Sequence, residues 1–431
     1  MIPLALLLLF LATLGTPLFV VLGGLAWLLF KAAQIDPSAI MIELYRLAST
    51  PTLVSIPLFT FAGTVLAASH TPQRLVRCAQ ALVGWLPGGL ALVALVACAF
   101  FTAFTGASGV TIVALGTLLL PLLLQEHYPE SFSLGLLTTC GSLGLLFPPS
   151  LPLILYGLVA QTSIDLLFLA GVIPGLLLVL LLGLFSMQQA RRRHVPRHRS
   201  SWEEAGTALW DAKWELLLPV LLLLGIYGGM VTVSEAAVVT AVYSLVITVG
   251  IHRDLHPWRD LPRLMTQSMV LVGAILIILG MALGFTSYLV DAQVPMHILA
   301  AMQHYITSRV VFLLVLNVFL LIVGCLMDIF SAIIVVVPLI TPIAAQFGVH
   351  PLHLGIIFLT NLEIGYLTPP VGLNLFIGSL CFGRSMTQLY RASWPFLLVL
   401  LAALLLITYI PDLSLGLVRL LGYASLPSFR R

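Results

Sequence analysis

The stretch that decides the fold is residues 141–157, GSLGLLFPPSLPLILYG. It is almost entirely apolar, yet two consecutive prolines, Pro148-Pro149, interrupt it. Proline lacks a main-chain N–H and clashes with the preceding helical turn, and the residue before it, here Phe147, is pushed towards an extended conformation. We therefore expect one helix to end near Gly144 and another to restart at the prolines. The carbonyls of Gly144 and Leu145 would then lose their helical partners.

The same interruption occurs again 221 positions later, in residues 361–376, NLEIGYLTPPVGLNLF. This shift places Gly144 on Gly365 and the first diproline pair on Pro369-Pro370. Matching leucines mean little in so apolar a chain, but two diproline pairs that each follow a glycine by four residues are hard to obtain by chance. Paired broken segments in two halves are typical of secondary transporters that bind substrate where the repeats meet. The sequence leaves open whether the repeats are inverted.

The composition places the chain in a membrane. Of its 431 residues 60% are apolar and only 8% are charged, whereas soluble proteins carry roughly 25% charged residues. A soluble enzyme, a nucleic-acid binder and a disordered scaffold are thereby excluded, and a net charge of +3 is too small to indicate a polyanionic partner. We expect an all-α polytopic bundle that lies in lipid. The first apolar run, Leu4–Leu29, is too long for a signal peptide and predicts a retained membrane helix.

One basic loop, residues 189–213, divides the chain. The bias of Lys and Arg towards the cytoplasm places this loop inside the cell. Five segments are expected: scaffold helices in 1–100, a first hairpin and broken helix in 101–165, further scaffold helices in 166–310, a second hairpin and broken helix in 311–394, and a C-terminal helix with its tail in 395–431.

The broken segments suggest ion chemistry. Freed carbonyls are ligands for a small hard cation, and a restarting helix presents N–H groups and a positive dipole end to an anion. Oxygen ligands without thiols or imidazoles suit Na⁺ better than a transition metal. The five cysteines lie singly in or beside apolar runs and predict small buried side chains rather than a metal site.

Four polar residues admit two interpretations each. Asp328 lies at membrane depth and is a candidate cation ligand, or else a helix N-cap. Glu363 is either functional or a neutral structural group. Asn361 and Asn374 flank the second break and bind either substrate or backbone. By contrast, residues 232–235, TVSE, match a capping box and favour the start of a helix.

These segments resemble a known family. Residues 141–157 and 361–376 are similar to the two signatures of the large membrane subunit of tripartite ATP-independent periplasmic (TRAP) transporters. Supporting matches are SIPLF at 55–59, FLAGVIPG at 168–175, and GG at 228–229 with SEAA at 234–237, so the resemblance spans nearly the whole chain.

The resemblance implies an elevator-type transporter of the bacterial inner membrane, multi-pass and surrounded by lipid. Two hairpins and two discontinuous helices would form a mobile transport domain. Sodium would drive the uptake of an organic acid, a carboxylate, delivered by a periplasmic substrate-binding protein. A small four-helix membrane subunit would complete the scaffold. Neither an enzymatic activity nor a nucleic-acid partner is expected.

The resemblance and the freed carbonyls together predict at least two Na⁺ sites and one substrate site. The first hairpin tip departs from the family, because TGAS at 105–108 replaces the common Ser-Gly-Ser and no acid follows in 109–113. This puts the substrate type, or one side-chain contribution to ion binding, in doubt. The predicted Na⁺ ligands are Thr105, Gly106, Ser108, Gly141, Gly144 and Pro148 in the first repeat and Gly324, Asp328, Gly365, Thr368 and Pro369 in the second. The predicted substrate contacts are Ala107, Ser108, Ser150, Asn361, Thr368 and Asn374.

Other interpretations compete with this one, one of them also a transporter. Residues 106–109, GASG, match the rhomboid-type G-x-S-G of intramembrane serine proteases, but that chemistry needs a histidine base near Ser108. The ten histidines lie in polar loops or near segment ends. An ion-coupled permease that uses no binding protein would need the same kind of hairpins, so the sequence does not distinguish it from a transporter that uses one. A channel or a purely structural subunit needs no matched pair of broken helices.

Overall fold

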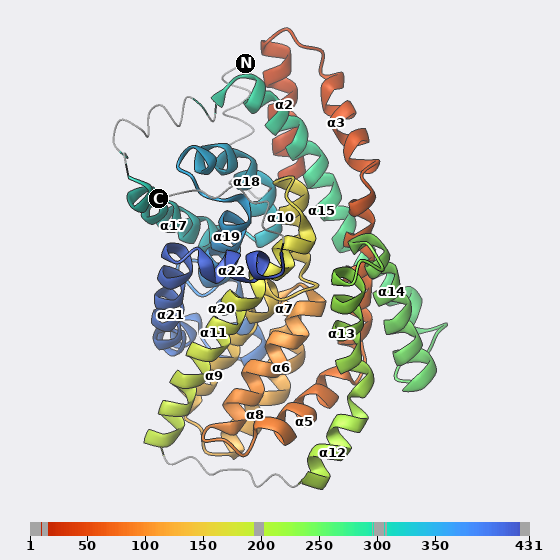
Figure 1. Ribbon diagram of the computed structural model, residues 1–431, viewed down its shortest axis with the longest axis vertical. Coiled ribbons are helices and arrows are strands. Elements are labelled where there is room, and N and C mark those ends of the chain that lie inside the picture. The colour runs from red at the N-terminus through yellow and green to blue at the C-terminus, as the bar shows by residue number, and fades with distance from the viewer. Residues whose placement is uncertain are drawn as a thin grey trace.

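The computed structural model describes residues 16–193, 202–294 and 308–422, together with Phe10, Met296 and Ile306. Over these residues the regular structure is helical (Figure 1). Eight of the described helices are long and apolar enough to cross a membrane, or nine if the bent pair formed by residues 130–146 and 151–159 counts as one further span. An all-α polytopic bundle is thereby confirmed.

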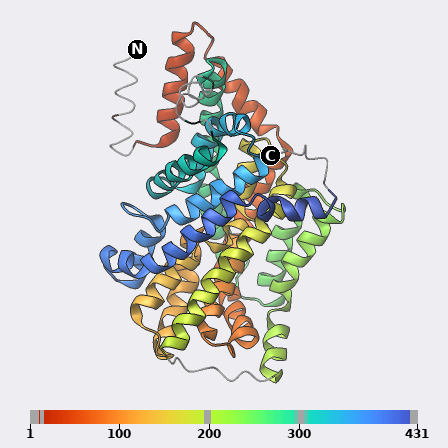
Figure 2. The same cartoon turned by 60° about the vertical axis from the view of Figure 1, so that its left-hand side comes forward.

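One group of helices packs together and is called the frame here. Within it α15 lies against α2, α3 and α4, and α14 lies against α4 and α13. Figure 2 shows α2 and α3 projecting with the end of α15 beyond the body that holds the remaining helices. The frame consists of α2 (Leu18–Ala32), α3 (Ser38–Ala48), η1 (Pro51–Val54), α4 (Ser55–Ala68), α13 (Lys213–Tyr227), α14 (Val233–Leu245), η4 (Val246–Ile251) and α15 (Asp260–Asp291).

Two repeat units lie against the frame, each a hairpin followed by a broken helix. The first is made of α6 (Gly89–Thr105), α7 (Ser108–Thr111), η2 (Ile112–Gly116), α8 (Thr117–Gln125), α9 (Glu130–Cys140), η3 (Leu143–Leu146) and α10 (Leu151–Val159). The second is made of α17 (Arg309–Leu326), α18 (Ile329–Gln346), α19 (Pro351–Gly365) and α20 (Leu373–Phe382). The remaining helices are α5 (Thr71–Val83), α11 (Ile164–Arg192), α12 (Trp202–Asp211), α21 (Met386–Tyr409) and α22 (Asp412–Leu420).

The repeats are inverted. The hairpin of α6 and α8 approaches the middle of the molecule from one end and the hairpin of α17 and α18 from the other (Figure 1). The shift of 221 positions also relates the two hairpin tips, since it takes Ser108, where α7 begins, to Ile329, where α18 begins. The broken segments therefore belong to a structural duplication that includes the hairpins.

Both breaks are wider than the sequence predicts. Phe147 is extended, with φ −92° and ψ 139°, as expected for a residue before proline. The helices do not restart at the prolines, however, but at Leu151 and Leu373, after loops that contain both diproline pairs. Each Pro-Pro peptide bond is cis. Ser150 and Gly372 occupy the N-cap positions, so both diproline pairs precede the first turn and do not form it.

Two other boundaries also differ. Helix α6 runs through residues 100 and 101, so the first hairpin begins at Gly89 rather than at the expected boundary. The predicted Leu4–Leu29 span lies partly outside the described residues, and its described part forms α2, which starts at Leu18 after Pro17. The capping box is confirmed, because Thr232 and Glu235 exchange the two hydrogen bonds at the start of α14. Four of the five cysteines are buried as predicted, while Cys381 is partly exposed.

Glycine lets each hairpin lie directly on its own break. A Cβ on Gly144 would lie 2.2 Å from the Ala99 carbonyl oxygen and 2.5 Å from the Ala103 nitrogen, both in α6. A Cβ on Gly365 would lie 2.6 Å from the Gly324 Cα in α17. The same shift of 221 relates Ala103 to Gly324, so the two close contacts are equivalent. Each break is thus held against the end of a hairpin arm by main-chain contact.

Candidate substrate and ion site

Both hairpin tips open onto one cavity of about 710 Å³. The first tip contributes Thr105–Gly109 and the second contributes Asp328–Phe330, while α4 and α15 of the frame close the other side. Among the described residues that line it, Asp328 is the one charged side chain. The cavity is otherwise lined by apolar groups and by hydroxyl and amide groups, among them Thr60, Thr64 and Gln267.

The first tip presents uncapped N–H groups. Gly106 ends α6 in the left-handed region at φ 63°, and Ala107 occupies the N-cap position, where it has no side-chain oxygen to accept from the next turn. The helix that begins at Ser108 continues to Gln125. Thr105 is 8% exposed and lines the cavity, and its Oγ1 has no hydrogen-bond partner among the described atoms. This tip therefore offers donors that the protein does not itself satisfy.

The second tip is capped by the chain's own carboxylate. Asp328 Oδ1 accepts from the N–H groups of Phe330 and Ser331, both at 3.0 Å. The N–H of Ile329 donates to the Tyr366 hydroxyl at 2.6 Å, which ties the tip to the second break. The N-cap interpretation of Asp328 is thereby confirmed, and its carboxylate also faces the cavity.

A group of oxygen atoms lies behind the first tip. Thr102 Oγ1 is 2.8 Å from Thr111 Oγ1 and 3.0 Å from the Gly141 carbonyl oxygen, and it also donates to the Cys98 carbonyl at 2.7 Å. The Ser108 carbonyl oxygen is near as well, 3.2 Å from where a Cβ on Gly141 would be. Hydroxyl and carbonyl oxygens without thiols or imidazoles are a donor set that fits Na⁺. The sequence analysis missed Thr102 and Thr111. The feature that could have identified them is that each arm of the first hairpin carries one threonine hydroxyl.

The equivalent interruption in the second repeat predicts free carbonyls at Gly365 and Tyr366 as well as at Gly144 and Leu145. This prediction is wrong for Gly144, Gly365 and Tyr366. The Gly144 oxygen accepts from the Phe147 N–H at 3.0 Å, because the chain tightens into a 3₁₀ turn before the prolines. In the second break the Gly365 oxygen accepts from the Thr368 N–H at 2.9 Å and the Tyr366 oxygen from the Asn374 N–H at 3.2 Å. A carbonyl oxygen has two lone pairs, so each still has capacity for a cation.

The structure brings only some of the predicted residues to the cavity wall. Thr105, Gly106, Ala107, Ser108 and Asp328 line it. The remaining predicted residues lie in the two breaks or next to them and are not among those that line the cavity. These are Ser150, Asn361, Thr368, Asn374, Gly141, Gly144, Pro148, Gly324, Gly365 and Pro369.

The two asparagines bind other parts of the protein. Asn361 Nδ2 donates to Asn317 Oδ1 at 2.7 Å and to the Ile357 carbonyl, which makes it part of a buried network in the second repeat unit. Asn374 Nδ2 reaches the Thr138 carbonyl and Ser142 Oγ, both at 3.3 Å, and so links the second repeat unit to the first. Hydrogen bonding to other groups of the protein therefore fits both residues better than substrate binding.

Three further polar residues differ in what surrounds them. Ser150 and Glu363 are fully buried, and neither Ser150 Oγ nor either Glu363 carboxylate oxygen has a hydrogen-bond partner among the described atoms. Thr368 Oγ1 donates to the Ile364 carbonyl at 3.0 Å.

Residues of the frame complete the cavity, and the sequence analysis did not select them. Thr60 and Thr64 are one helical turn apart on α4, and Gln267 lies on α15. Tyr366 of the second break also lines the cavity and was not selected either. In the sequence these residues are visible as polar side chains within apolar spans. Only the fold shows that they line the same cavity.

The serine-protease alternative finds no support at this site. Ser108 lines the cavity, but no histidine does among the residues the structure describes. His353 instead lies in the first turn of α19, where its ring nitrogens are 3.2 Å from Ser414 Oγ and the Thr408 carbonyl.

Two inverted hairpins and two broken helices that enclose one cavity against a frame define a membrane transporter. A solved structure has the same fold: the YdaH transporter of Alcanivorax borkumensis aligns with a TM-score of 0.64 over 88% of this chain and 89% of its own, at 14% identity. At that identity the likeness concerns the fold.

The chain belongs to the DctM component family of tripartite ATP-independent periplasmic transporters, whose family model matches residues 4–413. It is 38% identical over 93% of both chains to the C4-dicarboxylate TRAP transporter large permease protein DctM of Pseudomonas aeruginosa. It is also 33% identical to the ectoine/5-hydroxyectoine TRAP transporter large permease protein UehC of Ruegeria pomeroyi, over 85% of this chain and 86% of that one. The protein is thus the large subunit of a TRAP transporter and a multi-pass protein of the inner membrane. Its relatives are permeases rather than enzymes.

Proposed function

We propose that this chain carries a small organic acid through the inner membrane together with Na⁺. A periplasmic substrate-binding protein delivers the acid, and a small four-helix membrane subunit completes the scaffold. The observation that supports this function best is the shared cavity, because two inverted hairpin tips and two frame helices enclose a space of about 710 Å³ at the level of both breaks. A volume in the range of roughly 300–1,000 Å³ is that of small-molecule sites.

Sodium binds on the side of each tip that faces its break. In the first repeat unit the ligands are the oxygens around Thr102, Thr111 and Gly141, next to the Ser108 carbonyl. In the second repeat unit they are the Asp328 carboxylate with main-chain oxygens near Gly324 and Gly365, where the tip contacts the break. The bound cations supply positive charge to a cavity in which the one charged side chain described is acidic.

The carboxylate of the substrate binds at the first tip. The N–H groups at Ser108 and Gly109, uncapped by Ala107, and the unpartnered Thr105 hydroxyl point to an anion there. At the second tip Asp328 already occupies the equivalent position. The rest of the acid lies against the apolar wall formed by Val110, Val113 and the frame.

An elevator movement transfers the site across the membrane. The repeat units carry both tips and both breaks, so they move as one body with the bound acid and Na⁺ while the frame stays in place. The cavity supports this division, because one wall is built from the repeat units and the other from α4 and α15.

Uptake in proteoliposomes tests the coupling. The chain is reconstituted with its small subunit and binding protein, and a panel of radiolabelled carboxylates that begins with succinate is offered with an inward Na⁺ gradient. We expect accumulation of at least one acid that requires Na⁺. Equal uptake in K⁺ medium without a gradient contradicts the coupling, and equal uptake without the binding protein favours a self-sufficient permease.

A further inference from the structure

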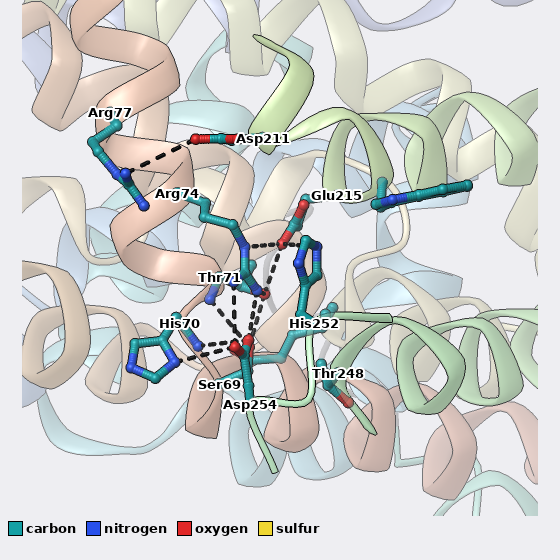
Figure 3. Close-up of polar contacts among 12 residues, drawn as sticks. Ser69, His70, Thr71, Arg74, Arg77, Asp211, Glu215, Thr248, His252 and Asp254 are labelled. Atoms are coloured by element: carbon teal, nitrogen blue, oxygen red, sulfur yellow. Dashed lines mark hydrogen bonds and ion pairs between the residues drawn. The ribbon is translucent and has the colours of Figure 1, made fainter. Parts of the chain in front are cut away.

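A second buried polar cluster lies away from the cavity, at the start of α5 (Figure 3). Helix α5 joins α4 of the frame to α6 of the first repeat unit, so it is the chain's first covalent link between the frame and the repeat units. The helix is amphipathic: Arg74, Leu75 and Cys78 are buried, whereas Gln73 and Arg77 are exposed. Any movement of the first repeat unit against the frame has to be absorbed within α5 or at one of its ends.

One buried guanidinium holds the start of α5. Arg74 Nε donates to Glu215 Oε1 at 2.5 Å, and Arg74 Nη2 donates to Asp254 Oδ2 at 2.6 Å. Glu215 lies in the first turn of α13, and Asp254 lies in the connection from η4 to α15, so both acceptors belong to the frame. Arg74 is 7% exposed and Glu215 only 2%. Figure 3 shows Arg74 between the two carboxylates, with His252 on the far side of Glu215.

Asp254 also holds the residue that precedes α5. The His70 main-chain N–H donates to Asp254 Oδ2 at 3.1 Å, and His70 Nδ1 is 3.2 Å from Oδ1. Burial opposes ionisation of Asp254, but the hydrogen bonds from Arg74 and His70 and the charge of Arg74 outweigh it and hold its pKa below the ordinary value. The contribution of Asp254 to stability is therefore complete at neutral pH and is lost only as the pH falls through that lowered pKa.

The other end of α5 is built differently. Residues 84–88, GWLPG, lead into α6, and Gly88 is in the left-handed region at φ 77°. The side-chain hydrogen bond here, from Trp85 Nε1 to the Leu82 carbonyl, stays between neighbouring residues. Short loops at element ends are the usual positions where large backbone changes are absorbed in domain movements.

We propose that Arg74 is a positioning residue that fastens α5 to the frame, so that the first repeat unit moves about residues 84–88. The proposal rests on the proposed function, because it requires the repeat units to move. Removing one partner of a buried ion pair leaves an uncompensated charge, so Arg74 and its two acceptors hold α5 only as a set. The exposed pair on the same helix, Arg77 with Asp211 at 4.0 Å, contributes little by comparison.

Distances between spin labels test this proposal without knowledge of the substrate. Cys381 is replaced by serine, and the other four cysteines are buried. One labelled pair, Gln73→Cys with Met265→Cys, reports α5 against the frame. The other, Leu124→Cys with Met265→Cys, reports the hairpin against the frame. The full chain is measured in lipid nanodiscs, in Na⁺ and in K⁺ media.

We expect one narrow distance for the α5 pair and two distances for the hairpin pair. In the Arg74→Gln variant the α5 pair gains a second, longer distance, and Arg74→Lys restores part of the narrow population. The matched control Arg77→Gln, one turn further along the same helix, leaves the α5 distance unchanged. A purely structural role would lower the yield or melting temperature of Arg74→Gln without adding a distance.

Two results overturn the proposal: an α5 pair that is as heterogeneous as the hairpin pair in the unmodified protein, or an α5 pair that stays narrow in folded Arg74→Gln. A single hairpin distance under every condition contradicts the elevator movement instead, and so separates failure of the proposed function from failure of the anchor.

Discussion

The two hairpin tips occupy equivalent positions but carry different residues before the helix. Ala107 stands before the helix of the first tip, where Asp328 stands before the helix of the second. At the second tip the carboxylate satisfies two main-chain N–H groups, whereas at the first the corresponding donors face the cavity. The duplicated backbone has thus been kept while the chemistry of the two ends has diverged.

Under the proposed function, this difference is what separates an anion site from a cation site within one fold. A helix start without a cap attracts negative charge, and the same start with its own carboxylate repels an anion and attracts a cation. The cavity between the tips is therefore polarised without any basic side chain among its described lining residues. Four sets of substitutions test whether the two repeats are equivalent in structure and their tips different in role.

The largest effect is expected at the breaks themselves. Replacement of Pro148-Pro149 by Ala-Ala restores two main-chain N–H groups and lets the helix continue, so the first hairpin loses its contact surface and uptake is abolished. The equivalent change at Pro369-Pro370 has the same effect if the repeats are equivalent. Succinate uptake and the yield of folded protein check this for both variants. Normal transport in either one contradicts a role of that break.

The close glycine contacts give the next largest effect. Gly144→Ala places a Cβ 2.2 Å from a main-chain oxygen, and Gly365→Ala places one 2.6 Å from Gly324 Cα, so both overpack the hairpin contact at a cost of roughly 1–3 kcal/mol. We expect the first variant to be destabilised more, because its main-chain contact is the shorter one, 2.2 Å against 2.6 Å. Thermal unfolding measures the difference. Gly273→Ala, whose Cβ has no atom within 4 Å apart from the backbone of its own helix, is the control and is expected to unfold no earlier than the unmodified protein.

Filling the empty cap comes third. Ala107→Asp copies the second tip onto the first, so its carboxylate competes with the substrate for the same N–H groups. We expect the apparent affinity for succinate to fall about tenfold, which corresponds to about 1.4 kcal/mol. Binding by isothermal titration or uptake kinetics measures it. Ala107→Asn caps the helix without a charge and should cost less. An unchanged affinity in the Asp variant contradicts anion binding at this tip.

The smallest effect on folding is expected from the reverse change. Asp328→Ala removes one N-cap and should lower the free energy of unfolding by about 1 kcal/mol. We expect a larger effect on Na⁺ binding, in free energy, than on folding. The Na⁺ concentration that gives half-maximal uptake should therefore rise, because the carboxylate is a proposed ligand of the cation. A variant that loses only stability, with unchanged Na⁺ dependence, assigns Asp328 to capping alone.

Much of the fold could be predicted because it follows from local chemistry. The prolines at 148–149 and 369–370 interrupt helices whatever surrounds them, and the repeat of that pattern predicted two equivalent units. The capping box at Thr232 also needed only neighbouring residues. The site was predicted less completely. The hairpin tips were selected, whereas Thr60, Thr64 and Gln267 on the opposite wall were not, since nothing local distinguishes them from other polar residues in a span.

The sequence by itself determined that the chain lies in a membrane, that it is duplicated, and where its helices break. The effects of a missing N–H group and of an apolar composition do not depend on which distant segments of the chain come into contact. Only the tertiary structure decided which of the freed oxygens found another donor, which tip kept an empty cap towards the cavity, and that Arg74 lies between Glu215 and Asp254. These last facts depend on which distant segments meet, and a buried polar group has its energy set by the partners it meets there.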